Sequence, residues 1–186
     1  PRSTLFPYTT LFRSGAARIV GEVNRIGLEN QPNACATVGL LNVAPNSRNV
    51  IPGSVFFAVD IRHPKDEILS NMDAELRQVA AKIADESGLE MHFEEIWYSP
   101  PVVFDEACVS AVRDAAARSG ITHMDIVSGA GHDACYLARI APTAMIFVPC
   151  ENGISHNEIE EAAPADLEAG CNVLLQAMIE RANAGA

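Results

Sequence analysis

The spacing of apolar residues between Thr37 and Phe93 constrains the fold more than any other feature of this sequence. Segments 37–43 and 55–62 have the period-two pattern of strands, and the turn-rich stretch Pro45–Asn49 lies between them. An apolar stripe at intervals of three and four residues follows and predicts an amphipathic helix, formed by Ile68, Met72, Leu76, Val79 and Ile83. The pattern therefore predicts a hairpin covered by a helix.

Helical spacing also precedes the hairpin, and a half-exposed strand pattern follows the second helix. We expect a helix over residues 16–26 that ends at Gly27, and a strand over residues 89–93 after a helix stop at Ser87–Gly88. The order helix, strand, strand, helix, strand is that of a ferredoxin-like α+β unit without its opening strand. We therefore expect residues 15–98 to form a partial ferredoxin-like lid or dimerisation domain.

A second module is expected over residues 99–186, after the proline-rich linker Ser99–Pro101. Helix and strand patterns alternate there, which is typical of a parallel or mixed α/β sheet that binds ligands in the loops after its strands. The expected strands are residues 124–127 and 144–148, of which the second is apolar enough to be buried. Three helices are expected. The first begins after Asp105, its N-cap, and ends before Gly120, and the second covers residues 132–139. The third begins near Pro164 and has Leu167, Cys171, Leu174 and Met178 on its packed face.

Residues 1–14 have none of these patterns. They resemble one reading frame of a short-read sequencing adapter, so we exclude them from the expected fold. A targeting peptide is the alternative, but Pro7 interrupts the apolar run that such a peptide needs.

Composition limits the compartment and the partners. The formal net charge of −11 argues against nucleic acid as a partner. Since no apolar run approaches the roughly 18 residues of a membrane span, we expect a soluble chain with no membrane partner. The five cysteines are odd in number and contain no C-x-x-C pair, which favours a reducing, cytoplasmic compartment and small core residues over disulfides.

Two loops that follow apolar segments carry candidate ligand-binding residues. In the first, the backbone of Ser128–Gly131 precedes a helix opened by His132 and Asp133, where N–H groups would bind a carboxylate or an oxyanion. The alternative is a tight turn without a ligand. The second loop carries His156, whose neutral imidazole is a common ligand for zinc or manganese. On sequence alone, a solvated loop histidine is the more frequent case.

Two further candidates lie in the first module. Arg62 at a strand end offers a planar fork for a carboxylate, and Asn49 can both donate to and accept from a ureido or amide group. The simpler interpretations are an ion pair between Arg62 and Asp60, and a turn residue at Asn49. Strand alternation directs Arg62 away from the face that carries the valine and isoleucine residues.

The two loops together are similar to a known family of enzymes. The motifs V-S-G-A-G-H-D-A at residues 127–134 and M-I-F-V-P-C-E-N-G-I-S-H-N-E at residues 145–158 resemble the C-terminal active-site segments of metal-dependent amidohydrolases related to aminoacylases and carboxypeptidases. The likeness is to the branch of N-carbamoyl-L-amino-acid hydrolases, allantoate amidohydrolases and β-ureidopropionases, and it runs from about Gly15 to Ala182. The stretches 49–53 and 57–62 are similar to the part of the lid domain that binds the substrate carboxylate in that branch.

The resemblance implies a role for each candidate residue. His156 corresponds to a metal ligand, while Asn49, Arg62 and Gly129 correspond to substrate contacts. His132 and Asp133 are expected to orient metal-bound groups. The implied cofactors are two divalent ions, which are Zn, Mn, Co or Ni, and the implied partners are a small ureide or N-carbamoyl amino acid and a second copy bound through the ferredoxin-like domain.

The family's other metal ligands and its general base have no counterpart in this sequence. We therefore assign no catalytic residue, and we expect residues 99–186 to be the C-terminal part of a catalytic domain. The chain as given is expected to be inactive by itself. Two alternatives stay open. One is a peptidase or aminoacylase of the same family, and the other is a dimerisation or binding module without catalysis.

Two pairs of residues imitate family motifs in the wrong module or context. His123 and Asp125 have H-x-D spacing, and Glu94–Glu95 resembles the family's adjacent glutamates. We interpret the first pair as a strand entrance and the second as a solvated strand edge. His63 and His92 have no convincing partners in the sequence.

Overall fold

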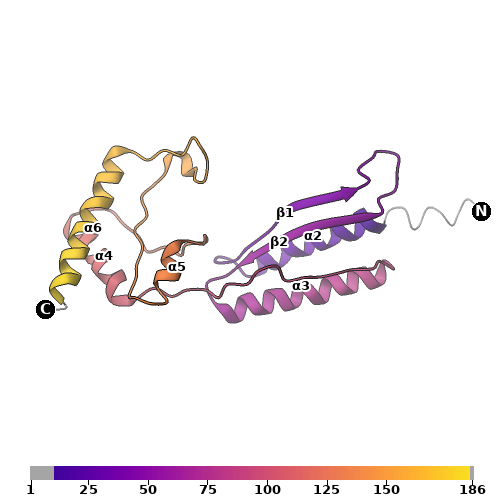
Figure 1. Ribbon diagram of the computed structural model, residues 1–186, viewed down its shortest axis with the longest axis horizontal. Helices are drawn as coiled ribbons and strands as arrows, with labels where there is room; N and C mark the ends of the chain where they lie inside the picture. The colour runs from indigo at the N-terminus through magenta and orange to yellow at the C-terminus, as the bar shows by residue number, and fades with distance from the viewer. Residues whose placement is uncertain (1–10, 185–186) are drawn as a thin grey trace, which may run out of the picture. The chain divides into compact units, whose positions relative to one another are not determined.

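The computed structural model describes residues 11–184 and divides the chain after Pro101 into two compact units. The chain is a mixed α/β protein with a small sheet (Figure 1). The first ten residues of the adapter-like segment lie outside the described residues. None of the helices within residues 11–184 has both the length and the apolar character that crossing a membrane requires.

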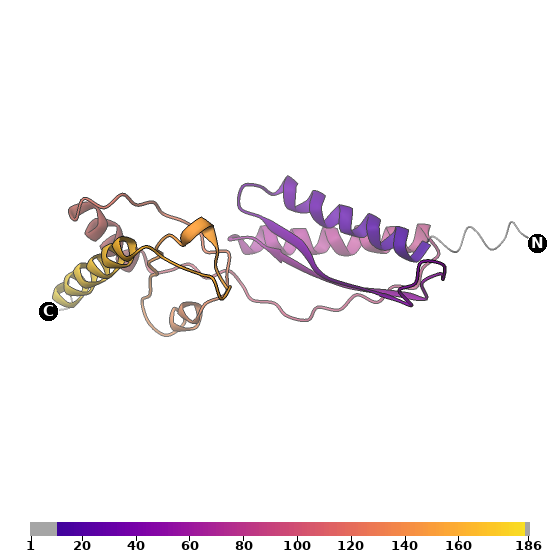
Figure 2. The same cartoon turned by 90° about the horizontal axis from the view of Figure 1, so that it is seen from above.

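The first unit is a two-stranded antiparallel sheet with two helices on one of its faces, as Figure 2 shows. Its elements are helix α2 (Leu11–Glu29), strand β1 (Cys35–Ala44), strand β2 (Ser54–Arg62) and helix α3 (Asp66–Glu86). The strand register runs from Cys35 opposite Arg62 to Ala44 opposite Ser54. The predicted hairpin and helix are confirmed, because Phe57, Val59 and Ile61 of β2 pack against the helices as the alternation indicated.

The core of the first unit forms between α2 and α3. Its largest fully buried side chains are Val23, Ile26 and Met72. The predicted stripe on α3 is confirmed as the packed face of that helix, since Leu76 and Ile83 are also buried. The core therefore joins two helices that the turn-rich hairpin separates in sequence.

Helix α2 differs from its predicted bounds at both ends. It begins at Leu11, inside the segment that we excluded from the fold, and it continues through Gly27 to Glu29. Gly27 is not a helix stop. A Cβ at Gly27 would lie 2.8 Å from Cβ of Ala36, so the glycine lets α2 approach β1 closely.

The predicted strand over residues 89–93 is wrong as a paired strand. The segment is extended, but within residues 11–184 it joins no ladder, and the sheet consists of β1 and β2. The predicted alternation is visible in part, because Leu89 and Phe93 are half-buried while Met91 is 37% exposed. A strand requires a hydrogen-bonded neighbour, which periodicity does not reveal.

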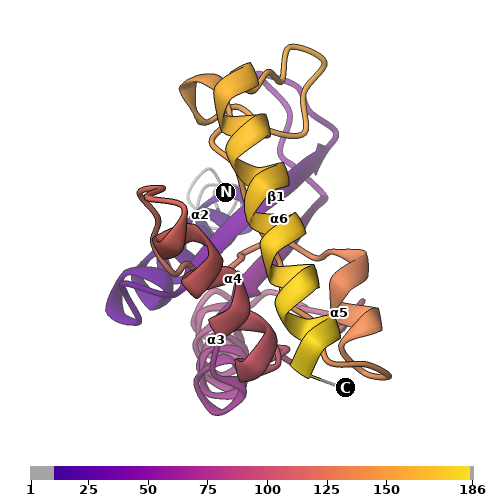
Figure 3. The same cartoon turned by 90° about the vertical axis from the view of Figure 1, so that its left-hand side faces the viewer.

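The second unit is built around two helices that lie alongside each other, as Figure 3 shows. Its elements are α4 (Glu106–Arg118), α5 (Asp133–Leu137), the 3₁₀ turn η1 (Glu151–Gly153) and α6 (Pro164–Ala184). The predicted N-cap of α4 is confirmed, because the Asp105 carboxylate accepts a hydrogen bond of 2.9 Å from the backbone N–H of Cys108. Gly120 follows the helix with a φ of +66°, as its predicted place past the end suggested.

The expected strands of the second unit are wrong. Segments 124–127 and 144–148 have no regular secondary structure and form no ladder within residues 11–184. Segment 144–148 is also not fully buried, since Phe147 is 50% exposed. An apolar run of this kind has a central place in a sheet only when neighbouring strands flank it on both sides. The helix expected over residues 132–139 is shorter and covers Asp133–Leu137.

The packed face of α6 is not the predicted one. Val173 and Ala177 are buried, while Met178, on the predicted face, is 62% exposed. The reason is the partner helix, because α4 presents small residues that α6 approaches closely, namely Ala111, Ala115 and Ala116. The predicted residues Leu167, Cys171 and Leu174 are exposed as well.

The cysteines are all free, and the expectation that most are core residues is wrong. Cys35 and Cys171 are exposed, and the other three are half-buried.

Candidate functional site

The loop that carries His156 is a closed, strained turn. The backbone N–H of Glu151 donates to the carbonyl of Glu161 over 2.7 Å, which ties the two ends of the loop together. Within it, Asn152 and His156 have φ values of 54° and 56°, in the left-handed region that non-glycine residues seldom occupy. Strain of this kind is typical of functional turns.

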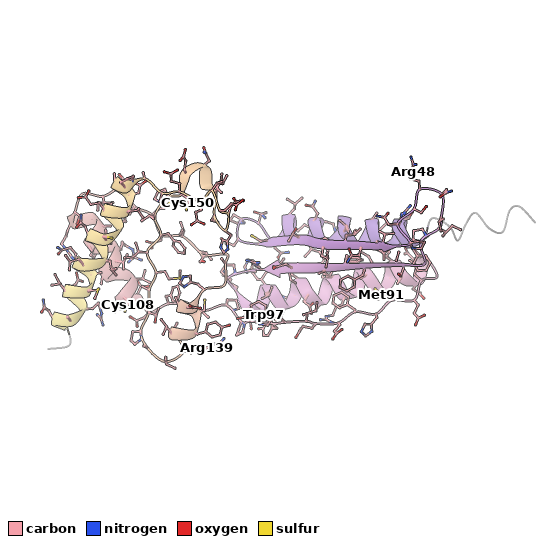
Figure 4. The ribbon with its side chains drawn as sticks, turned by 45° about the horizontal axis from the view of Figure 1, so that its top comes forward. Arg48, Met91, Trp97, Cys108, Arg139 and Cys150 are labelled. Atoms are coloured by element: carbon pink, nitrogen blue, oxygen red, sulfur yellow. The ribbon has the colours of Figure 1, made fainter. Side chains whose placement is uncertain are left out.

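Local hydrogen bonds hold the backbone of His156 and leave its ring exposed. The N–H of His156 donates to Oε2 of Glu160 over 2.7 Å. Oε1 of the same carboxylate lies 3.9 Å from the Cys150 thiol, which Figure 4 labels beside the loop. The loop therefore presents the imidazole outward, in a form available to a ligand.

The donor set around His156 does not by itself fit a metal ion. Within residues 11–184, no group of three or more histidine, cysteine, aspartate or glutamate side chains is arranged to hold one. The carboxylate of Glu160 already accepts a hydrogen bond from the backbone N–H of His156. A tightly held divalent ion needs about four ligands, so His156 supplies only part of such a site.

The glycine-rich loop is a turn stabilised by Ser128. Its hydroxyl donates to the carbonyl of Ala130 over 3.3 Å and accepts from the N–H of Ala130 over 3.4 Å. A Cβ at Gly129 would meet no atom within 4 Å, so packing in this chain does not require glycine there.

His132 is the N-cap of α5. Its Nδ1 accepts from the N–H of Ala134 over 3.1 Å, so the free proton of the neutral ring lies on Nε2. Asp133 follows as the exposed first residue of the helix. A helix of five residues has too small a dipole to form an anion site, which corrects the interpretation that we drew from this loop.

In the first unit, Arg62 forms a bidentate ion pair with Asp60. Nε and Nη2 of Arg62 donate to the two carboxylate oxygens over 2.8 and 2.7 Å. Arg62 lowers the pKa of the Asp60 carboxyl, and Asp60 raises the pKa of the guanidinium. Both side chains are about half exposed, so the simpler prediction of a surface ion pair describes this structure.

Asn49 lies in the turn between the strands and accepts from the Ser47 hydroxyl over 2.9 Å. It is therefore a turn residue here, as its simpler interpretation predicted. The structure places Asn49 and Arg62 at opposite ends of the hairpin, because Arg62 pairs with Cys35 at the start of β1 while the turn follows Ala44. Figure 4 shows Arg48, the neighbour of Asn49, beyond the ends of the strands.

That separation is larger than a small substrate. The nine residues of β2 span roughly 27 Å at about 3.4 Å per residue. An arginine and an asparagine side chain together reach less than half of that distance. One copy of the chain therefore cannot bring Asn49 and Arg62 to the same small molecule while the hairpin keeps this geometry.

The two imitations of family motifs have local partners. Nδ1 of His123 lies 2.8 Å from the carbonyl oxygen of Ile121. Oδ2 of Asp125 forms an ion pair with Nη2 of Arg113 over 2.7 Å. Glu94 and Glu95 are exposed, as predicted, although their segment is not a paired strand.

His63 is a residue that sequence reasoning missed. It is 8% exposed, and its Nδ1 accepts from the N–H of Lys65 over 3.0 Å just before α3. Its position between the last strand residue and a proline was the available signal for a role in the turn that precedes α3. His92 has only a distant partner, because its Nε2 lies 3.9 Å from Glu94.

Comparison with known proteins places these features in a family. The model of peptidase family M20/M25/M40 matches residues 11–180. An N-carbamoyl-L-amino-acid amidohydrolase of Rhizobium meliloti is 46% identical over 166 residues, which are 89% of this chain and 40% of the relative. The allantoate amidohydrolase of Bacillus subtilis is 32% identical over 161 residues, covering 87% of this chain and 40% of that protein.

A solved structure is consistent with the family model and with the two similar sequences. The crystal structure of an amidase of the hydantoinase/carbamoylase family from Burkholderia multivorans has a TM-score of 0.87 and 63% identity, and the match covers 90% of this chain and 41% of that one. The chain thus spans about 40% of the length of the curated relatives it matches.

The fold and the loops are thus similar to part of proteins that are named amidohydrolases. This chain belongs to peptidase family M20/M25/M40, and the predicted resemblance to its carbamoylase and allantoate amidohydrolase branch is confirmed. Amidohydrolases of this family are generally metal-dependent.

Proposed function

We propose that this chain is part of a two-metal amidohydrolase that cleaves the C–N bond of N-carbamoyl-L-amino acids or related ureides such as allantoate and β-ureidopropionate. The observation that carries the proposal is the 46% identity, over nearly the whole chain, to an N-carbamoyl-L-amino-acid amidohydrolase. Residues 15–98 are the partial ferredoxin-like lid, and residues 99–186 are the C-terminal part of the catalytic domain.

His156 is the metal ligand that this chain contributes. The outward imidazole on a strained loop supports that role, and the two divalent ions, which are Zn, Mn, Co or Ni, polarise water and the scissile carbonyl when bound. The chain's own donors do not complete the set. The chain alone therefore neither holds the metal pair tightly nor turns over a substrate.

Arg62 binds the substrate carboxylate. The resemblance of residues 57–62 to the family's lid segment supports that role, and a planar guanidinium suits a carboxylate. Asn49 and the backbone at Gly129 bind the polar atoms of the ureido group. His132 and Asp133 orient groups at the metal from the start of α5.

The separation of Asn49 from Arg62 along the hairpin supports a site built by two copies. We propose a homodimer formed through the first unit, in which Arg62 of one copy and Asn49 of its partner bind the same substrate molecule. Closed two-fold symmetry then produces two equivalent sites.

A chimera tests the function directly. Residues 15–182 of this chain replace the matching segment in the N-carbamoyl-L-amino-acid amidohydrolase of Rhizobium meliloti, and turnover of an N-carbamoyl-L-amino acid is measured with added manganese. The chimera is expected to be active and to lose at least about 100-fold in kcat/KM when His156→Ala removes a metal ligand. A folded chimera that is inactive, or one that tolerates His156→Ala, contradicts the proposal.

A second candidate is a peptidase or aminoacylase, which the name of the matching family model favours. The same chimera assayed on an N-acyl amino acid and a dipeptide separates the two. A higher kcat/KM on those substrates than on the N-carbamoyl amino acid would select the second candidate. A third candidate, a dimerisation or binding module without catalysis, requires that the dimeric chimera be inactive on all three substrates.

A further inference from the structure

The backbone of His156 is held in a conformation that costs free energy. Its φ of 56° lies in the left-handed region, which few residues other than glycine occupy. Such a conformation persists only where the surrounding contacts favour it more strongly than the strain opposes it. The contacts within the loop therefore identify what determines the direction of the His156 side chain.

One such contact comes from Glu160. Its Oε2 accepts a hydrogen bond of 2.7 Å from the backbone N–H of His156. A hydrogen bond to an ionised carboxylate is roughly twice as strong as one between neutral groups, and its usual length is about 2.7–2.9 Å. The bond holds the peptide group that precedes the N–Cα bond of His156, which is the bond that φ describes.

A tight turn brings Glu160 back toward His156. The N–H of Glu160 donates to the carbonyl of Asn157 over 3.0 Å, and the N–H of Ile159 donates to Oδ1 of Asn157 over 3.2 Å. The first is the hydrogen bond of a β-turn over residues 157–160, and the second is the side-chain turn for which asparagine is well suited. Asn157 thus places the backbone of Glu160 within reach of His156.

The backbone on the other side of Glu160 is anchored as well. The carbonyl of the next residue, Glu161, accepts from the N–H of Glu151 over 2.7 Å, which ties it to the start of the loop. Oε1 of Glu160 lies 3.9 Å from the thiol of Cys150, labelled in Figure 4. Both carboxylate oxygens therefore have a partner within the loop, which distinguishes Glu160 from a solvated surface glutamate.

We propose that Glu160 is a positioning residue, whose carboxylate holds the left-handed backbone of His156 and so determines the direction of its imidazole. The inference rests on the proposed function, in which His156 serves the active site. Without the hydrogen bond, φ of His156 relaxes from 56° to the right-handed value of about −63°. That change turns the side chain by roughly 120° about the N–Cα bond, so the ring no longer presents its nitrogen atoms in the same direction.

The same loop offers a matched control. Glu158 carries the same charge, lies two residues from His156 and is exposed. Among residues 11–184, the carboxylate that accepts from the His156 N–H is that of Glu160. Glu158→Ala therefore removes an equal charge and leaves the contact in place, while Glu160→Gln removes the charge and keeps an oxygen that accepts from the N–H.

Amide hydrogen exchange of the full chain, resolved by residue with NMR, tests the contact. In Glu160→Ala the His156 N–H is expected to lose at least about tenfold protection, whereas Glu158→Ala and Glu160→Gln keep most of it. The N–H of Cys108, which Asp105 caps in the other part of this unit, is the internal reference and is expected to stay unchanged. Unchanged exchange of the His156 N–H in Glu160→Ala overturns the proposal. An equal loss in Glu158→Ala, or at Cys108, also overturns it, because the effect would then be one of charge or of general stability.

Turnover by the chimera with the Rhizobium meliloti enzyme tests the consequence for the site. Glu160→Ala is expected to lower kcat/KM at least about tenfold, Glu160→Gln to restore most of that loss, and Glu158→Ala to leave kcat/KM unchanged. A folded Glu160→Ala chimera with the parental kcat/KM overturns the positioning role. An inactive parental chimera contradicts the proposed function instead, and the exchange experiment then decides by itself whether Glu160 holds His156.

Discussion

The close approach of α2 to β1 at Gly27 makes a prediction whose sign is opposite to that expected for a glycine in a helix interior. Glycine in a helix interior costs about 1 kcal/mol relative to alanine, so replacement by alanine ordinarily stabilises. At Gly21 of the same helix, a Cβ would meet nothing within 4 Å. Gly21→Ala is therefore expected to stabilise the first unit by up to about 1 kcal/mol.

Gly27→Ala is expected to destabilise the unit. The new Cβ would lie 2.8 Å from Cβ of Ala36 and 3.5 Å from its backbone nitrogen, so strand β1 must shift. Overpacking of this kind costs about 1–3 kcal/mol, which exceeds the propensity gain near the end of the helix. The net loss is about 1 kcal/mol, equivalent to a fall of roughly 4–8 °C in Tm for a unit of this size.

A double-mutant cycle isolates the contact. Ala36→Gly removes the group that the new Cβ would meet, so Gly27→Ala in that background is expected to recover most of the loss. Urea unfolding followed by far-ultraviolet circular dichroism measures all four variants, and hydrogen exchange of α2 assigns the change to the first unit. A Gly27→Ala variant as stable as Gly21→Ala would refute the packing explanation.

Three further predictions concern the second unit. Val173→Ala is expected to lower the free energy of unfolding by about 2 kcal/mol, because the Val173 side chain is 4% exposed and packs against α4. Met178 is 62% exposed, so Met178→Ala is expected to change that free energy by less than about 0.5 kcal/mol. Equal effects of the two substitutions in urea unfolding would contradict the observed packed face of α6. The hydrogen bond from the Cys108 N–H lowers the pKa of the Asp105 carboxyl in the folded state. The ionised Asp105 carboxyl therefore stabilises α4 above its unfolded pKa of about 3.9, and this stabilisation is lost as pH falls through the lower folded pKa. Exchange protection of the α4 amides is expected to fall below about pH 4 in the parent. Asp105→Asn keeps a capping oxygen that does not titrate, so its protection is expected not to fall in this way. In isothermal titration of the isolated chain with manganese, His156→Ala is expected to leave the weak heat of binding unchanged, and a clear loss would show that the chain holds the ion by itself.

The sequence predicted the elements whose partners lie close along the chain. The stripe on α3 and the alternation in β2 were enough because each element packs on its sequence neighbours. The Asp105 cap was also visible, since the donor lies three residues away. Such features depend on local chemistry alone.

The failures share one physical cause. Segments 89–93, 124–127 and 144–148 have the composition of strands, but a strand exists only with a hydrogen-bonded neighbour, and none is present within residues 11–184. The packed face of α6 was mistaken because its apolar stripe is wide, and the small residues of α4 decide which side is buried. Composition cannot identify a partner that lies elsewhere in the chain.

For the candidate site, too, the sequence predicted some features and could not predict others. The family motifs identified His156 and the glycine-rich loop, and the strained φ of His156 adds a structural reason for interest in that residue. The separation of Asn49 from Arg62 could not be predicted from a list of site residues, since it depends on the strand register. That register is the origin of the two-copy proposal.

A hybrid dimer of chimeras tests the central claim most directly. Chimeras that carry Asn49→Ala and Arg62→Ala, each with a different affinity tag, are co-expressed, and the doubly tagged hybrid is purified and assayed on an N-carbamoyl-L-amino acid. If Arg62 of one copy and Asn49 of the other share a substrate, the hybrid has one intact site and about half of the parental activity, while each variant homodimer loses most of its activity. A hybrid no more active than the variant homodimers would mean that both residues serve the site from one copy, contrary to the proposed arrangement.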